Sequence, residues 1–264
     1  LCIEALSSGE YEDTFLNKRK YPIQSTGFYT INPQFGSLIR TALEIGYTLF
    51  SYETTQNLGG EPREKDQANN VKKIIEEKPN EKILIYCGYG HAFEGTVGSY
   101  FGGSALAGRI QNLTGINPLT IDQVVYSEKS KIEYNPPLVK AIDINEPSIL
   151  IDENNIPFSH KKKKSWIDIV VFHPITKYIN NRPNSFINYG NKLVQIDLST
   201  IDIEFPVMVM AFNNNEDFKK AIPVDIIELE DESNVGFLIL KKGKYTIIVV
   251  NQAGEIAKFN KKVK

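Results

Sequence analysis

The segment 82–95 constrains the fold most, because an uninterrupted apolar run is followed directly by glycines and then by a histidine. The run Ile83–Tyr86 is bounded by turn residues, a pattern typical of a strand buried on both faces. In open α/β sheets, ligands bind in the crevice outside the carboxyl ends of the strands. We therefore expect His91 to lie at the functional edge of a parallel sheet. The alternative is a histidine that only caps the strand.

The first half of the chain alternates strand and helix signals. Asn32 as N-cap, Pro33 in the first turn and Gly46 as the stop predict one helix, and a charged helix follows. The predicted strands are 1–5, 47–53, 83–86 and 119–126, and the predicted helices are 33–46, 62–78 and 105–113. Strands separated by helices imply right-handed crossovers. The sequence thus predicts an α/β fold with a mostly parallel sheet flanked by helices.

After about Ser127 the helical periodicity fades, and prolines and asparagines separate short β-rich runs. The predicted strands of this half are 166–172, 192–196, 207–212, 222–229, 235–240 and 245–250. This spacing is typical of a small antiparallel sheet or sandwich. We therefore predict an α/β domain over 1–130 and a smaller β-rich, sandwich-like domain over 145–264, joined between about Ser127 and Asn145.

Composition excludes some classes of protein. The 264 residues have a formal net charge of −2, which gives no general reason to expect a nucleic-acid partner. The basic run 161–164 and the adjacent His160 are predicted to be a solvated loop. Cys2 and Cys87 lie in apolar runs without a metal-binding spacing, so we expect both to be buried and unpaired. No run is long and apolar enough to predict a membrane span.

Four polar residues lie at or near the predicted carboxyl ends of the strands or on the helix facing them. Glu4 follows the first strand, Glu53 the second and His91 the third, and Arg63 opens the charged helix. A carboxylate beside a histidine raises its basicity and orients it, as general-base chemistry requires. An arginine can hold a carboxylate or a developing oxyanion. We therefore assign these four residues as candidate catalytic residues.

The turn around His91 supplies candidate substrate-binding residues. These are Gly88, Tyr89, Gly90 and Glu94. His91 and Glu94 could both ligate a divalent metal, and Tyr89 could ligate haem iron, so a divalent metal and haem both stay open as cofactors. The glycines match neither a dinucleotide nor a P-loop motif. His173, before a proline in the β-rich half, favours a structural role.

Several motifs of the first half occur together in one known superfamily. They are Ile3-Glu4-Ala5, Tyr52-Glu53, the helix 63–70, Gly88-Tyr89-Gly90-His91 and the segment 114–123. In this order they resemble the erythromycin-esterase-like, ChaN-like and Tiki superfamily. The resemblance covers residues 1–126 and leaves the second half unexplained.

The resemblance implies one site built from two Gly-x-x-His motifs, an acidic residue and an arginine. Gly88-x-x-His91 matches the second motif, Glu4 the glutamate and Arg63 the helix arginine. The first Gly-x-x-His is absent. We therefore expect a chain that is incomplete at its N-terminus; the alternative is a protein that has lost the activity.

The leading functional hypothesis is a hydrolase-like protein that activates water against an ester or peptide bond of a small-molecule or peptide substrate. His91 would be the general base or a metal ligand, Glu4 and Glu53 would orient it, and Arg63 would bind substrate charge. One alternative is a ChaN-like protein that binds haem or a small ligand without turnover. Another is an interaction module that acts through the β-rich half. The compartment, cytoplasmic or periplasmic, stays open.

Overall fold

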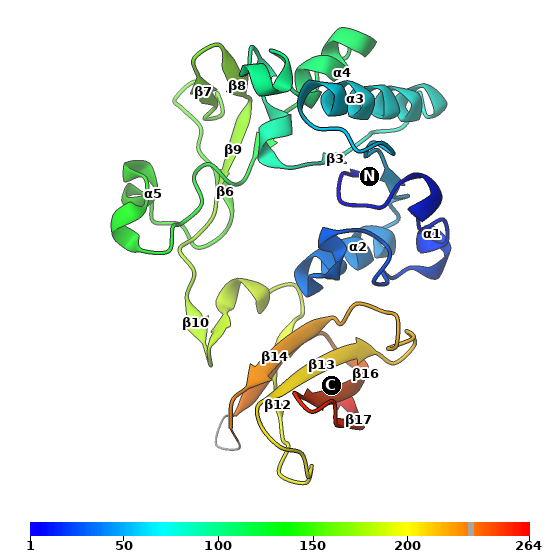
Figure 1. The fold of residues 1–264 in the computed structure, drawn as a ribbon. Helices are drawn as coiled ribbons and strands as arrows, with labels where there is room; N and C mark the ends of the chain where they lie inside the picture. Colours follow the sequence, from blue (N-terminus) through cyan, green and yellow to red (C-terminus); the bar gives the residue numbers. More distant parts are fainter. Residues whose placement is uncertain (232–234) are drawn as a thin grey trace. The chain divides into compact units, whose positions relative to one another are not determined.

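A computed structural model describes residues 1–231 and 235–264, which form a mixed α/β structure with several small sheets (Figure 1). By their contacts these residues group into two compact units. The first unit contains 1–10 and 50–175, and the second contains 11–49 and 176–264. The chain therefore leaves the first unit after residue 10 and returns to it at residue 50.

The first unit contains a three-stranded parallel sheet with two helices packed on one face. Its strands and helices are β1 (Cys2–Ile3), β2 (Phe50–Ser51), α3 (Gly60–Glu77), β3 (Ile85–Tyr86), β4 (Glu94–Gly95), α4 (Leu106–Thr114), β5 (Ile121–Asp122), α5 (Pro137–Ala141), β6 (Ser148–Ile149), β7 (His160–Lys162), β8 (Ser165–Ile167) and β9 (Ile169–Phe172). In the sheet, β1 lies between β2 and β3 and is parallel to both. Helices α3 and α4 pack against each other (Figure 1). Their buried Val71 and Ile110 share an apolar cluster with Cys2 of β1.

The prediction that the strand 83–86 is buried on both faces is wrong. Ile83 and Ile85 pack against the cluster below α3 and α4, whereas Leu84 is 50% and Tyr86 43% exposed. Side chains alternate between the two faces of a strand, and the helices cover only one face of this edge strand. The regular strand is also shorter than predicted and contains only Ile85 and Tyr86.

The rest of the first unit is built from two further small sheets. In one, β8 pairs antiparallel with β4 and β7; in the other, β9 pairs parallel with β5 and antiparallel with β6. The predicted strand 119–126 is reduced to β5, which pairs with β9 and not with β1, β2 or β3. The mixed α/β class is therefore observed, but the parallel pairs are confined to β1–β2, β1–β3 and β5–β9 among the described residues.

The basic run 161–164 forms the exposed tip of the β7–β8 hairpin, with Lys163 at a positive φ of 58°. The solvated-loop prediction is therefore confirmed for the lysines. It is wrong for His160, which is only partly exposed and lies edge-on to the rings of Phe93 and Tyr126. His160 is at the start of β7, the end of the hairpin farthest from the turn, where it contacts these rings.

The second unit contains two antiparallel sheets that share one apolar core. Its strands and helices are α1 (Leu16–Arg19), α2 (Pro33–Glu44), β10 (Tyr178–Ile179), β11 (Arg182–Pro183), β12 (Lys192–Ile196), β13 (Val207–Asn213), β14 (Asp225–Leu229), β15 (Gly236–Leu240), β16 (Gly243–Asn251) and β17 (Ile256–Val263). One sheet has the order β14-β13-β16-β17, and β12 pairs with β15 in the other. Val209, Leu238 and Ile247 are fully buried between them.

The opposite face of the four-stranded sheet is also apolar, and the segment 11–49 covers part of it. Phe212 and Ile248 form a second cluster there with Tyr21. Arg40 of α2 binds Glu216 through two hydrogen bonds of 2.8 and 2.6 Å. The division of the chain therefore differs from the predicted boundary between about 127 and 145, which falls inside the first unit. The second unit begins again only at Thr176, and it takes residues from the predicted α/β half because its sheet has two apolar faces.

Several local predictions are confirmed. The Asn32 side chain caps α2 by accepting from the backbone N–H groups of Gln34 and Phe35, at 2.9 and 3.3 Å. Both cysteines are unpaired as predicted, and Cys2 is buried; the prediction of burial is wrong for Cys87, which is only partly buried. None of the helices in 1–231 and 235–264 combines the length and apolarity needed to cross a membrane.

Candidate functional site

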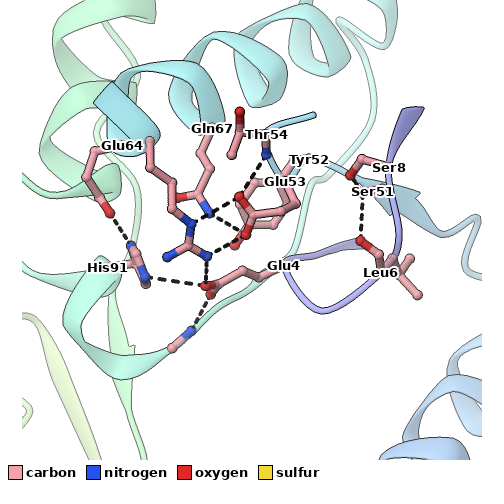
Figure 2. Close-up of polar contacts among 12 residues, drawn as sticks. Glu4, Leu6, Ser8, Ser51, Tyr52, Glu53, Thr54, Glu64, Gln67 and His91 are labelled. Carbon is pink, nitrogen blue, oxygen red and sulfur yellow. Dashed lines mark hydrogen bonds and ion pairs between the residues drawn. The ribbon is translucent and has the colours of Figure 1, made fainter. Parts of the chain in front are cut away.

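Three polar side chains follow the three parallel strands of the first unit. Glu4 comes directly after β1, Glu53 lies two residues after β2, and His91 lies in a 3-10 turn (Tyr89–Ala92) after β3. Arg63 reaches them from the first turns of α3. Because parallel strands end at the same edge of a sheet, the topology brings these four residues together (Figure 2).

Arg63 is the centre of this cluster. Its Nη2 donates to Glu4 Oε1 at 2.6 Å and also to Glu53 Oε2, while its Nε donates to Glu53 Oε1 at 3.1 Å (Figure 2). The Arg63 side chain is 26% exposed, so solvent reaches the cluster. The Glu53 hydrogen bonds and, after them, those of Glu4 raise the pKa of Arg63, which stays a cation. Among the described residues, no hydrogen bond or ion pair uses its Nη1.

His91 is held between two carboxylates. Its Nδ1 lies 2.6 Å from Glu64 Oε1, and its Nε2 lies 3.4 Å from Glu4 Oε1. The His91 side chain is 12% exposed and that of Glu64 only 2%. The imidazole is therefore oriented from its buried side by Glu64, and its Nε2 lies on the side of Glu4, whose side chain is 19% exposed (Figure 2).

The surroundings of His91 act on its pKa in opposite directions. Burial is the largest influence and lowers the pKa, and Arg63 lowers it further. The carboxylates of Glu64 and Glu4 outweigh both, so the pKa of His91 lies above its ordinary value. The site therefore contains a histidine that is more basic than a free imidazole.

The other members of the cluster keep the carboxylates in place. Gly88 donates its backbone N–H to Glu4 Oε2 at 2.7 Å, and Gln67 donates to Glu53 Oε2 at 3.0 Å. Cys87 lies on the same segment, but burial, followed by Glu4, raises its pKa to about 12. A thiol with this pKa remains protonated near neutral pH and is a poor nucleophile.

Of the four predicted substrate-binding residues, three lie next to His91 and one lies outside the cluster. Gly88 is bound to Glu4, Gly90 lies against the ring of Phe101, and Tyr89 is 57% exposed in the same turn as His91. Glu94 is not part of the cluster. It is 1% exposed and accepts a 2.8 Å hydrogen bond from the Thr120 hydroxyl, because β4 carries it back into the core of the unit.

The residues of the site do not fit a metal ion. Within 1–231 and 235–264, no group of three His, Cys, Asp or Glu side chains is arranged to hold one. The Arg63 cation lies between Glu4 and Glu53, where it would repel a divalent cation. The predicted pairing of His91 with Glu94 as metal ligands is not observed, since Glu94 is bound to Thr120.

Sequence reasoning missed Glu64 and Gln67, both of which are buried on α3. One sequence signal could have identified Glu64. It lies four residues before Ala68 and seven before Val71, so it is a charged residue on the apolar stripe of the helix. A carboxylate in such a position needs a polar partner, and here the partner is His91. Of the two carboxylates predicted to orient His91, Glu4 contacts it and Glu53 instead binds Arg63, whereas Glu64 makes the closest contact.

Comparison of the chain with protein-family models, with curated proteins and with solved structures gives no match.

Proposed function

We propose that the first unit is a hydrolase-like module in which His91 acts as general base towards water. The observation that carries this proposal is the contact between Nδ1 of His91 and the buried carboxylate of Glu64. A carboxylate at one ring nitrogen orients the imidazole and stabilises its protonated form, which leaves the other nitrogen to take a proton from water. Nε2 of His91 lies on the side of Glu4 and Arg63, whose side chains are 19% and 26% exposed, and a substrate would bind there.

Arg63 would polarise the bond to be hydrolysed. Its Nε and Nη2 are bound to Glu53 and Glu4, which fixes the plane of the guanidinium. A fixed guanidinium can donate from Nη1 to a carbonyl oxygen and to the oxyanion that develops from it. The proposed substrate class is therefore an ester or peptide carbonyl, in a small molecule or a peptide.

We extend this proposal to the fold and the family. The parallel arrangement of β1, β2 and β3 supports a relationship to the erythromycin-esterase-like, ChaN-like and Tiki superfamily, as does the position of Gly88-x-x-His91 after β3. The resemblance pairs Glu4 and Arg63 in one site, and Nη2 of Arg63 lies 2.6 Å from Oε1 of Glu4.

The test is hydrolysis of a panel of p-nitrophenyl esters, a lactone and fluorogenic peptides by the purified chain. His91→Gln should lower kcat/KM by at least about 100-fold, the range expected for loss of a general base. His173→Gln is the matched control, because His173 forms a hydrogen bond of 3.2 Å to Gln123 elsewhere in the unit. Hydrolysis that His91→Gln leaves unchanged would overturn the proposal.

A second candidate function is binding of haem or a small ligand without turnover. It is favoured by Tyr89, whose ring is 57% exposed in the same turn as His91. The Soret band of added haemin would then shift and sharpen on binding, and Tyr89→Phe would weaken this change, because phenolate oxygen is a ligand of haem iron. Absence of both the spectral change and hydrolysis would leave neither function standing.

A further inference from the structure

The second unit contains a cavity of about 700 Å³ that the proposed function does not use. One wall is a polar face of α2 with Gln34, Ser37 and Thr41, which follow one another at helical spacing. The opposite wall comes from the ends of β13, β14 and β15 and from the segment 185–191. This volume lies within the range of small-molecule sites, about 300–1,000 Å³.

Seven charged residues line the cavity, and the three that are not exposed, Arg40, Glu216 and Asp225, are held in ion pairs. The other four are the exposed Lys20, Glu44, Lys241 and Lys242. Arg40 binds Glu216 at 2.8 and 2.6 Å, and Asn213 donates to the same carboxylate at 2.7 Å. Asp225 is bound by Arg182 at 2.5 Å and by the backbone N–H of Ile239 at 2.6 Å. These pairs place fixed donors and acceptors in the wall without a strong net field. A neutral ligand rich in hydrogen-bonding groups suits such a wall better than an ion.

Two aromatic side chains are held in the open at this cavity. Phe186 is 37% exposed and Tyr189 is 88% exposed. Tyr189 has a positive φ of 57°, and Gly190 follows it with a φ of 85°. A bulky residue is rarely found in this backbone region, and it stays there only when the surrounding structure holds it. The Tyr189 backbone is strained, and its exposed ring contributes nothing to the apolar core. This combination favours a role in contact with a ligand.

We propose that this cavity binds a neutral carbohydrate, with a sugar ring stacked on Tyr189 and its hydroxyls bonded to the polar wall. A pyranose has a C–H face that packs on an aromatic ring and hydroxyls that both donate and accept. The Gln34 amide supplies a matching donor and acceptor. The amide nitrogens of Asn191 and Asn213 already donate to Phe186 O and Glu216, so these two residues offer chiefly their amide oxygens as acceptors. The lysines at the cavity, Lys20, Lys241 and Lys242, are exposed, so water screens their charges. They are the reason to include an anionic sugar in the test.

The experiment is calorimetric titration of the full chain with maltotriose, cellotriose, chitotriose and the anionic trigalacturonate. We expect at least one neutral trisaccharide to bind, and Tyr189→Ala to weaken it about tenfold, which equals about 1.4 kcal/mol. Tyr178→Ala is the matched control, because Tyr178 is 68% exposed on β10 and is not among the residues that line the cavity. His91→Gln should leave binding unchanged, which separates this proposal from the proposed hydrolysis.

Three results would overturn the proposal. One is that none of the neutral trisaccharides binds. Another is that only trigalacturonate binds, which would assign the cavity to anions through its lysines. The third is that Tyr178→Ala and Tyr189→Ala weaken binding equally. A melting curve of each variant checks folding, and we expect no change for Tyr189→Ala because its ring is exposed.

Discussion

Glu64 Oε1 lies 2.6 Å from Nδ1 of His91, and the Glu64 side chain is 98% buried against a histidine that is 12% exposed. This contact joins α3 to the turn after β3, two segments that are separate in the sequence. A buried carboxylate without a cation or donor is costly, so the two residues depend on each other. The contact therefore links the stability of the first unit to the basicity of its candidate catalytic residue.

Glu64→Gln should shift the pH dependence of the proposed hydrolysis to lower pH. The raised pKa of His91 depends on the negative charge of Glu64, and glutamine keeps the size without the charge. A general base acts when it is deprotonated, so activity should rise with pH through the pKa of His91, and that rise should begin earlier in the variant. The measurement is kcat/KM against pH. Glu76→Gln on the same helix, with a side chain that is 61% exposed, should leave the profile unchanged.

His91 should also make the stability of the protein depend on pH. Its pKa is raised in the folded protein above the ordinary value of about 6.5, so between these two values the folded state binds more protons than the unfolded state. The free energy of unfolding should fall as pH rises in this interval. The stabilisation is complete below about pH 6.5 and lost as pH rises through the folded pKa. The measurement is the free energy of unfolding in urea as a function of pH over this interval, for the protein and for His91→Gln. If the two plots of free energy against pH run parallel, the prediction is contradicted.

Arg63 and Glu53 should be energetically coupled. The pair forms two hydrogen bonds, and both side chains are about one quarter exposed, which weakens the interaction relative to a fully buried pair. A double-mutant cycle with Arg63→Gln and Glu53→Gln should give a coupling of about 1–3 kcal/mol. The cycle requires the free energies of unfolding of the two single variants and the double variant. A coupling energy near zero would show that hydrogen bonds to water stabilise the two side chains as well as their ion pair does.

Glu94 should contribute to the core and not to the site. Burial, and to a smaller extent Asp168, raises its pKa, whereas the Thr120 hydroxyl bond lowers it. Because the pKa of Glu94 is higher in the folded than in the unfolded protein, the free energy of unfolding falls as pH rises from the unfolded pKa through the folded one. Glu94→Gln has no carboxyl to ionise and should not show this fall. The glutamine can still accept from Thr120, so the variant should be at least as stable near neutral pH.

Glu94→Ala should cost about 1–3 kcal/mol by leaving the hydroxyl without an acceptor. Loss of hydrolysis in Glu94→Gln would instead return this residue to the site.

The central and the edge strand of the parallel sheet should respond differently to truncation. Ile3 is fully buried in the central strand β1, and Ile3→Ala should cost about 2–5 kcal/mol. Leu84 is 50% exposed beside β3, and Leu84→Ala should cost less than about 1 kcal/mol. Chemical denaturation of both variants is the measurement. Similar losses would indicate that Leu84 is buried in solution.

Much of the local structure was predictable, because local rules determine it. Asn32 and Pro33 begin α2, the stripe Ala68–Ile75 faces the core from α3, and β12 has the predicted bounds Lys192–Ile196. These features depend on capping and on side-chain periodicity, which are properties of neighbouring residues. The order of strands and helices in the sequence also predicts that Glu4 and His91 lie at one sheet edge. In the structure, Nε2 of His91 lies 3.4 Å from Oε1 of Glu4.

The tertiary structure decided what packs on what, and therefore which partner each side chain has. Nothing local in the run Ile83–Tyr86 shows that helices cover only one face of its strand, so that Tyr86 is exposed. Likewise the alternation of β13 and β16 allows two apolar faces, but only the folded chain brings the segment 11–49 onto the second of them. Glu64 illustrates the same limit: its position on an apolar stripe shows that it needs a partner, and only the packing of α3 against the turn after β3 supplies His91. Capping and periodicity are set by residues close in sequence, whereas burial and ion pairing depend on segments that meet only when the chain has folded.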